Sequence, residues 1–221
     1  MTGNSRKQVY FFPGLGLSPK IFDHIQLGEV DCTFVRWMNP DSADESIVIY
    51  MDRLKDVYSI DKDPNVVFIG HSLGGILAQE LASHMGAVPV ILISSVKGPD
   101  ELPWHIRSLR HGYAYHLASK SFIKRTIPLW GGYHGYENQE VKDLLIDEVE
   151  TLANTYFIWA YKQAIYWEGA LKNTVIQHLH GTVDRTFPIR NISDCIPIKS
   201  GDHLMVYKHG EILSEHIRQC L

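Results

Sequence analysis

The pattern Gly70-x-Ser72-x-Gly74 could carry nucleophilic chemistry. A serine hydroxyl becomes a useful nucleophile when a sharp turn exposes it and a neighbouring base takes its proton. The apolar run 66–70 predicts a buried strand before Ser72, and residues 76–85 continue with helical spacing. We expect Ser72 at the apex of this turn, with glycines at 70 and 74 because side chains there would collide with the neighbouring strand or helix. The positive end of the helix that follows favours a developing anion.

The segment Val66-Val-Phe-Ile-Gly-His-Ser-Leu-Gly-Gly resembles the nucleophile elbow of the α/β-hydrolase family. In that family the order along the chain is serine, acid, histidine, so the resemblance implies that the partners lie downstream. The segment His180-Gly-Thr-Val-Asp-Arg-Thr-Phe-Pro resembles the family's acid loop, which implies Asp184 as the acid. Gly201-Asp202-His203 resembles its G-x-H loop, which implies His203 as the base.

Other acids and histidines compete for these roles. His71 adjoins the serine, but a neighbour in such a turn points away from it, so we expect His71 to pack structurally. Asp202 adjoins His203, which makes simultaneous alignment awkward. His178 and His180 alternate along a strand without an evident third ligand, so packing is expected rather than metal binding. We predict no metal and no other cofactor.

A tetrahedral intermediate needs two N–H donors. The resemblance implies that one is Leu73, directly after the nucleophile, and that the other lies in the loop after the first strand. Pro13-Gly14-Leu15-Gly16 occupies that loop, and we predict Leu15 N–H as the second donor. Many relatives carry His-Gly where this chain has Pro-Gly, but a backbone donor does not depend on that side chain.

The elements that must position these residues follow from apolar, β-prone runs. Such runs predict six strands, at 9–12, 32–37, 66–70, 88–94, 174–180 and 195–199. Helical patterns lie between them, and one is expected to begin at the capping box Ser42-Ala-Asp-Glu45 and to run to about Tyr58. Alternating strands and helices indicate an α/β fold with a mostly parallel six-stranded sheet covered on both faces. Each motif above follows a strand, at the edge where such sheets carry chemistry.

Two features set this chain apart from the family pattern. Only eight residues precede Val9, so we expect an N-terminally trimmed core without the family's two early antiparallel strands. About 80 residues separate the fourth and fifth strands, where a simple crossover would need far fewer. We expect a helical cap at 95–173, inserted into a hydrolase core of 1–94 and 174–221.

The expected cap holds more than half of the chain's 24 aromatic residues. They indicate a pocket for an apolar or aromatic acyl or alcohol group, with Trp104, Tyr133 and Trp159 as candidate contacts. Alternatively, they form the small core that the cap itself needs. Residues 102–135 carry five basic side chains, Arg107 among them, and no Asp or Glu, whereas residues 137–150 carry six acids. Either the two segments pair within the cap, or a basic rim with Arg107 receives an anionic substrate.

The composition excludes several other classes of protein. The net charge of −4 argues against nucleic acid as a partner. Three cysteines without CxxC spacing argue against a disulfide framework or a zinc site. The polar start lacks a signal-peptide core, and no apolar stretch reaches the roughly 18 residues of a membrane span. We therefore predict a cytoplasmic protein, and the sequence leaves its oligomeric state open.

These features predict a serine hydrolase, of class EC 3.1, that cleaves a carboxylic ester or thioester of a small molecule through an acyl-enzyme. Ser72 would be the nucleophile, His203 the base and Asp184 its orienting acid. The same triad can also act as a lyase, as in relatives that work in menaquinone synthesis or on cyanohydrins. A non-catalytic ligand-binding receptor on the same scaffold is a third alternative. Haloalkane dehalogenases and epoxide hydrolases carry aspartate at the elbow, so Ser72 argues against both.

Overall fold

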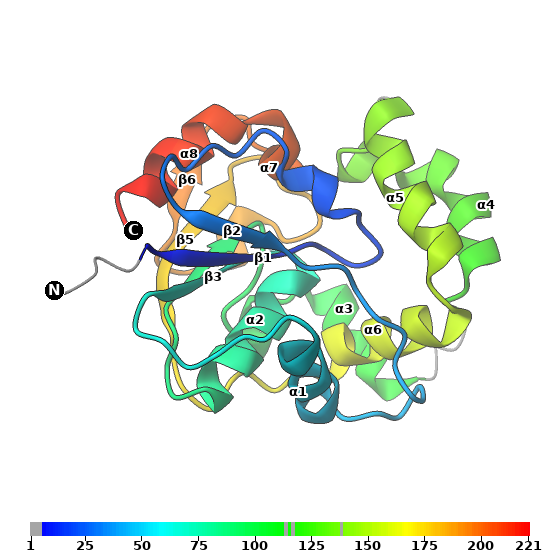
Figure 1. Cartoon of the computed structure of the whole chain (residues 1–221). Coiled ribbons are helices and arrows are strands. Elements are labelled where there is room, and N and C mark those ends of the chain that lie inside the picture. Colours follow the sequence, from blue (N-terminus) through cyan, green and yellow to red (C-terminus); the bar gives the residue numbers. More distant parts are fainter. Residues whose placement is uncertain (1–5, 113–114, 116–117, 138) are drawn as a thin grey trace, which may run out of the picture.

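A parallel sheet forms the centre of the molecule (Figure 1). The computed structural model describes residues 6–112, 115, 118–137 and 139–221; Tyr113, one of the aromatic residues counted above, lies outside these ranges. In this part of the chain six strands pair in the order β2-β1-β3-β4-β5-β6, every pair parallel. They are β1 Gln8–Phe12, β2 Asp31–Phe34, β3 Val66–His71, β4 Val90–Ile93, β5 Val175–Gly181 and β6 Ile196–Ile198. The predicted fold class is confirmed.

The central strands β3 and β4 are buried along their whole length, which explains why they are continuous apolar runs rather than alternating ones. Helices α1 (Ile47–Val57) and α2 (Leu73–His84) cover one face of the sheet. Helix α8 (Gly210–Arg218) covers the other, after the short helix α7 (Met205–Lys208) (Figure 1).

The predicted start of the first long helix at Ser42 is wrong. The N-cap of α1 is Ser46, whose hydroxyl accepts the N–H of Ile49 at 3.2 Å. The Ser42 hydroxyl instead accepts the N–H of Asp44 at 3.2 Å in a turn before the helix. The Glu45 carboxylate accepts the N–H of Asp41 at 2.8 Å and pairs with Arg53 at 2.8 Å. The local pattern is that of a capping box, but the N-cap lies four residues later, at Ser46.

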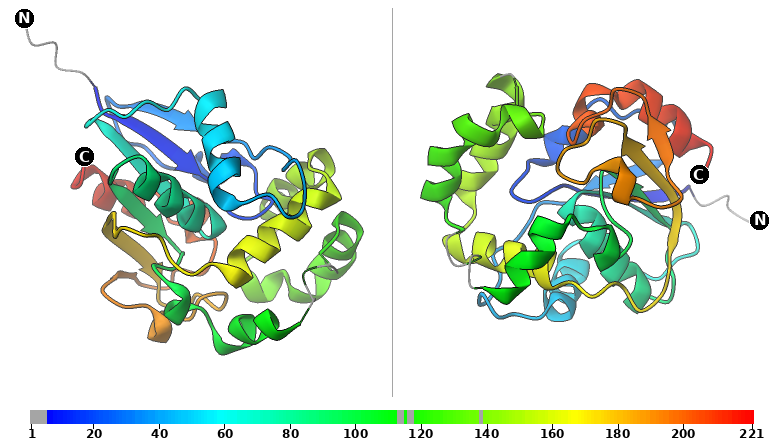
Figure 2. Two further views of the ribbon diagram at one scale, coloured as in Figure 1. Left: turned by 90° about the horizontal axis from the view of Figure 1, so that it is seen from below. Right: turned by 180° about the vertical axis from the view of Figure 1, so that it is seen from behind.

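Among the described residues, four α-helices lie between β4 and β5, and we call this part of the chain the 95–173 segment. They are α3 Trp104–Ser108, α4 Lys120–Trp130, α5 Gln139–Thr151 and α6 Asn154–Tyr166. They gather beyond the carboxyl ends of the strands (Figures 1 and 2). Helix α6 joins them to the rest of the molecule, because the Trp159 ring lies 4.1 Å from that of Tyr50. No helix among the described residues is long and apolar enough to span a membrane.

Candidate active site

Ser72 occupies a strained turn between β3 and α2. Its backbone angles are φ 52° and ψ −123°, a conformation that costs a non-glycine residue roughly 1–3 kcal/mol. A Cβ at Gly70 would lie 2.4 Å from the Cα of Gly75, and one at Gly74 would lie 2.1 Å from the carbonyl oxygen of Phe12. Both positions therefore require glycine, and the tight turn they permit leaves Ser72 on the wall of a pocket.

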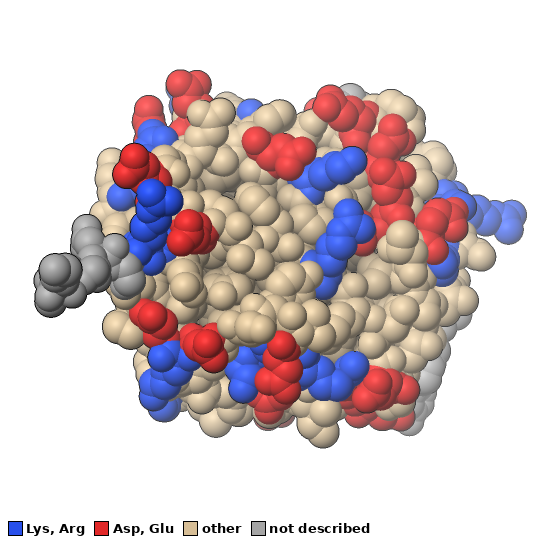
Figure 3. All heavy atoms as spheres, in the orientation of Figure 1, with Lys and Arg blue, Asp and Glu red and all other residues tan. Residues whose placement is uncertain are grey.

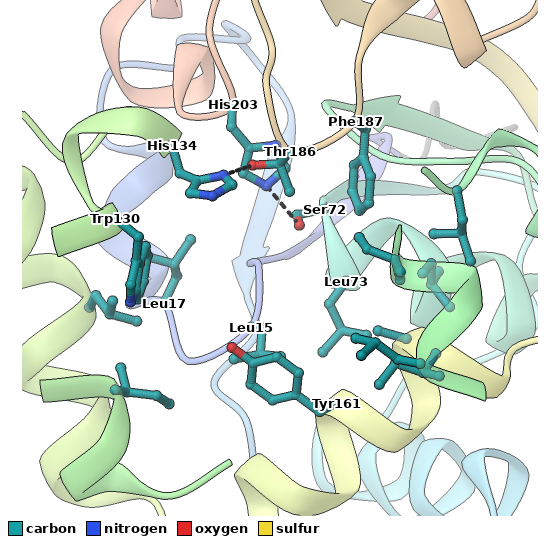
Figure 4. Close-up of a pocket in the computed structure, with 18 of the residues that line it drawn as sticks. Leu15, Leu17, Ser72, Leu73, Trp130, His134, Tyr161, Thr186, Phe187 and His203 are labelled. Carbon is teal, nitrogen blue, oxygen red and sulfur yellow. Dashed lines mark hydrogen bonds between the residues drawn. The ribbon is translucent and has the colours of Figure 1, made fainter. Parts of the chain in front are cut away.

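The structure brings Ser72, His203 and Asp184 together at the carboxyl edge of the sheet, and Figure 4 shows the first two of these side chains. His203 Nε2 lies 3.0 Å from Ser72 Oγ, and His203 Nδ1 lies 2.9 Å from Asp184 Oδ2. In the tautomer with the proton on Nδ1, the serine hydroxyl donates to Nε2 and Nδ1–H donates to the carboxylate. Asp184 and His203 are both buried. The geometry is that of a hydroxyl paired with a base and an acid that orients the base.

The loop after β5 fixes the Asp184 carboxylate. The backbone N–H groups of Thr186 and Phe187 donate to its Oδ1 at 2.8 and 2.9 Å, which leaves Oδ2 for His203. Burial raises the pKa of Asp184, but the His203 imidazole and these donors more than offset that effect, so the pKa lies below its ordinary value. Asp184 is therefore ionised at neutral pH and is aimed at the imidazole.

The residues that competed for these roles have other partners. The fully buried His71 donates from Nε2 to the backbone carbonyl of His203 at 2.8 Å. Burial and the nearby His203 lower the pKa of His71 to about 3, so its ring is neutral. The Asp202 carboxylate accepts the N–H of Leu204 at 2.9 Å and pairs with Lys208. The hydrogen bond from His71 thus holds the backbone of the loop that carries His203.

His178 and His180 lie side by side in β5. His180 Nδ1 is 3.2 Å from His178 Nε2, and His180 Nε2 is 2.7 Å from the carbonyl oxygen of Phe187. Burial lowers the pKa of both, that of His178 to about 3, so both rings are neutral at pH 7. The described residues contain no group of three or more side chains that could hold a metal ion.

The loop after β1 packs against the turn at Ser72. A Cβ at Gly74 would lie 2.3 Å from the carbonyl oxygen of Pro13, at the start of this loop. Leu15 in this loop and Leu73 after the serine both line the pocket. Within the described part of the chain, neither backbone N–H donates to another protein group. Two residues of the pocket lining therefore carry backbone donors without a partner in the part of the chain that the structure describes, and one of them begins α2 directly after the serine.

A cavity of about 410 Å³ opens at Ser72 (Figure 4). The loop after β1, helix α2 and the 95–173 segment form its walls, and most of the lining side chains are aliphatic or aromatic. Its volume lies within the usual range for small-molecule sites. The serine therefore faces a preformed apolar chamber.

The four side chains predicted to contact substrate lie elsewhere. Trp104 is 73% exposed, and Arg107 is exposed on the same short helix. Tyr133 is 57% exposed and packs under the guanidinium of Arg185, 4.8 Å from its ring centre. Trp159 is fully buried against the core. None of the four is among the described residues that line the cavity.

Other residues of the 95–173 segment form the wall instead. Trp130, Tyr136 and Tyr161 line the cavity, and so does His134, whose Nδ1 lies 2.7 Å from Thr186 Oγ1 (Figure 4). The aromatic enrichment indicated this segment but not which of its aromatic residues face the pocket. His134 and Thr186 carry no signal in the sequence.

Several of the basic side chains bind within the 95–173 segment. Arg110 donates to two backbone carbonyls at the end of α6, at 2.6 and 2.5 Å. Lys120 donates to the Glu150 carbonyl at 2.8 Å, and Lys124 pairs with the Glu150 carboxylate. Figure 3 shows the acidic side chains gathered along α5 with basic ones beside them. Two of the five cations, Lys120 and Lys124, therefore contact the acidic stretch 137–150, whereas Arg110 is held by carbonyls outside it.

Sequence comparison identifies the family. Residues 9–213 match the profile described as "Alpha/beta hydrolase family", so the chain belongs to that family. The search of curated proteins found no match.

Solved structures share the fold at low sequence identity. MenH from S. aureus aligns at 15% identity with a TM-score of 0.68, over 98% of this chain and 93% of that one. An epoxide hydrolase from Bacillus megaterium aligns at 12% with a TM-score of 0.69, over 97% and 93%. The esterase EaEST from Exiguobacterium antarcticum aligns at 15% with a TM-score of 0.63, over 98% and 92%. The names of the epoxide hydrolase and the esterase describe different activities. The structural similarity therefore supports the fold, and the reaction has to be inferred from the residues of the site.

Proposed function

We propose that this protein is a serine hydrolase that cleaves a carboxylic ester or thioester of a small molecule through an acyl-enzyme. The observation that carries the proposal is the unbroken alignment of Ser72, His203 and Asp184, at 3.0 and 2.9 Å, on the wall of an apolar cavity. Epoxide hydrolases of this family use an aspartate where this chain has Ser72.

In the first step the Ser72 hydroxyl attacks the carbonyl carbon of the substrate while His203 Nε2 takes its proton. The carbonyl π electrons move to the oxygen. They return as the bond to the leaving group breaks, and His203 gives its proton to the leaving alcohol or thiol. Asp184 stabilises the imidazolium because its carboxylate is ionised and lies 2.9 Å from Nδ1.

In the second step water attacks the acyl-enzyme with His203 as base, and the acid leaves as Ser72 regains its proton. The oxyanion that forms in each step is assigned to the N–H groups of Leu15 and Leu73. Neither N–H has an acceptor among the described residues, which supports this assignment, and Leu73 lies at the N-terminus of α2. Losing one such donor costs about 10²–10³-fold in rate.

We assign residues 95–173 the role of an inserted cap on a core of residues 1–94 and 174–221. Its helices supply many of the side chains that line the cavity, which supports a role in selecting substrate. A cytoplasmic location remains a prediction from the cysteine content.

The test is hydrolysis of p-nitrophenyl esters and acyl-CoA thioesters of graded chain length. We expect turnover by the wild-type protein, a fall of at least 10³-fold in Ser72→Ala, and one ¹⁸O atom from labelled water in the acid product. Products of elimination without ¹⁸O would instead indicate a lyase. Unchanged turnover in Ser72→Ala would contradict the proposal.

A further inference from the structure

The apolar cavity contains a small polar region that the hydrolytic reaction does not use. Beyond Ser72 and His203, the polar lining groups belong to His134, Thr186, Trp130 and two tyrosines. His134 and Thr186 bond to each other at 2.7 Å, and the Trp130 indole donates to a threonine hydroxyl within α4 at 2.9 Å. These groups therefore have partners within the protein, and the tyrosines remain to be explained.

The tyrosines are Tyr136 and Tyr161, from two different parts of the 95–173 segment. Tyr136 is 6% exposed, and Figure 4 shows the Tyr161 hydroxyl pointing into the cavity. Within the described part of the chain neither hydroxyl has a hydrogen-bond partner, and the two do not bond to each other. Burial raises the pKa of both, and the nearby Tyr161 raises that of Tyr136 further, so both phenols are neutral.

Two other buried tyrosines of this protein have partners for their hydroxyls. The Tyr50 hydroxyl bonds both backbone groups of Met38 at 3.0 Å. The Tyr156 hydroxyl accepts the N–H of Gly16 at 3.4 Å. A phenol hydroxyl that faces an apolar cavity without a protein partner needs a hydrogen bond from whatever fills the cavity, so two such tyrosines in the lining indicate a place for a ligand oxygen.

The ligand oxygen is uncharged. None of the described residues that line the cavity is Lys, Arg, Asp or Glu, so a charged group would lose its hydration without gaining a counter-ion. The acyl group is the part of the substrate that stays attached to Ser72 between the two steps. We therefore assign the cavity that adjoins Ser72 to the acyl group.

We propose that Tyr136 and Tyr161 form a subsite for a keto or hydroxyl oxygen on the acyl chain, remote from the scissile carbonyl. This inference rests on the proposed function. The preferred substrates are then esters or thioesters of medium-length oxo- or hydroxyacyl groups rather than of plain alkanoyl groups. The phenols donate to, or accept from, that oxygen, and the surrounding apolar walls bind the hydrocarbon on either side of it.

The test compares p-nitrophenyl decanoate with its isomeric oxo-derivatives, in which one ketone is moved stepwise along the chain. We expect kcat/KM of the wild-type protein to rise about 3- to 10-fold for an oxo group at one or two adjacent positions, as one or two neutral hydrogen bonds would give. In Tyr136→Phe and Tyr161→Phe that preference should shrink, and in the double variant the ratio of kcat/KM for the favoured oxo-isomer to kcat/KM for decanoate should fall to about one. Tyr133→Phe, at an exposed cap tyrosine, is the matched control.

A binding measurement separates the subsite from catalysis. Ser72→Ala protein titrated with the methyl esters of the same acids should bind the favoured oxo-isomer more tightly than decanoate, and Tyr161→Phe on that background should remove the difference. Equal preference in the wild-type protein and the double phenylalanine variant would overturn the subsite, even with turnover fully dependent on Ser72. Turnover that survives Ser72→Ala would instead overturn the proposed function.

Discussion

Gly74→Ala should damage the site without touching any group that reacts. The added Cβ would lie 2.1 Å from the carbonyl oxygen of Phe12 and 2.3 Å from that of Pro13, whereas real Cβ contacts almost never fall below 3.0 Å. Both neighbours are backbone atoms, so they cannot rotate away as a flexible side chain could. The loop after β1 or the start of α2 must move by roughly 0.9 Å, the difference between the shorter contact and that limit.

That movement separates the two sides of the site. The displaced loop carries Leu15, and the displaced helix begins with Leu73 beside Ser72. A misplacement of about 1 Å can cost about 10²-fold in rate, and overpacking of this kind costs about 1–3 kcal/mol in the free energy of unfolding. For a chain of this length we expect the melting temperature to fall by about 2–12 °C.

The assay is kcat and KM for a p-nitrophenyl ester at a temperature well below the melting transition, which circular dichroism measures. Gly98→Ala is the matched control, because a Cβ at Gly98 meets nothing within 4 Å and its φ of −167° suits alanine. The control should keep wild-type activity. Activity of Gly74→Ala within threefold of wild type would refute the argument that these carbonyls fix the site.

Two further predictions concern charge at the site. Asp184→Asn should leave the fold intact and lower kcat about 10⁴-fold, because the amide no longer stabilises the imidazolium or selects its tautomer; a loss below tenfold would contradict the role of Asp184. His71 has a folded-state pKa of about 3 against its ordinary 6.5, so the unfolded chain takes up its proton first and the free energy of unfolding rises with pH between those values and levels off above them. The free energy of unfolding, measured with urea at several pH values, should rise less steeply between pH 4 and 6 in His71→Gln than in the wild type, by up to about 1.4 kcal/mol per pH unit. The control His105→Gln, at an exposed position, should show the same dependence on pH as the wild type. The same dependence in wild type and His71→Gln would contradict a buried neutral His71.

The sheet could be predicted from the sequence because each strand carries its own signal. Strands buried on both faces are short apolar runs, and β3 and β4 are such runs. The turn at Ser72 was predictable for a similar reason, since Gly70 and Gly74 are required by contacts within a few residues or with a neighbouring strand. The pairing of Asp184 and His203 across 19 residues followed from the family resemblance rather than from any local pattern.

The pocket wall could not be predicted, because it depends on how helices pack. Trp159 and Tyr161 lie two residues apart on α6, yet the first packs into the core and the second lines the cavity. A helix that is apolar on more than one face gives no sign of which face meets the core. The support that His71 gives to the His203 carbonyl also joins residues 132 positions apart, and nothing in the sequence marks it.

The start of α1 at Ser46 could not be predicted from the local sequence either. The segment Ser42 to Glu45 has the composition of a capping box, but Glu45 is held by Arg53 one turn and more into α1. The residue types of a capping box are therefore not enough to locate the helix start, which lies at the next serine, Ser46.

The most direct measurement is the site of covalent labelling by a fluorophosphonate, read by intact-protein and peptide mass spectrometry. The attack needs a hydroxyl whose proton can pass to an adjacent imidazole, and the 3.0 Å contact between Ser72 Oγ and His203 Nε2 supplies both. We predict one adduct per chain, located on Ser72, absent in Ser72→Ala and formed at least 10²-fold more slowly in His203→Gln. An adduct on another residue, or labelling of Ser72 at the same rate without His203, would contradict the account.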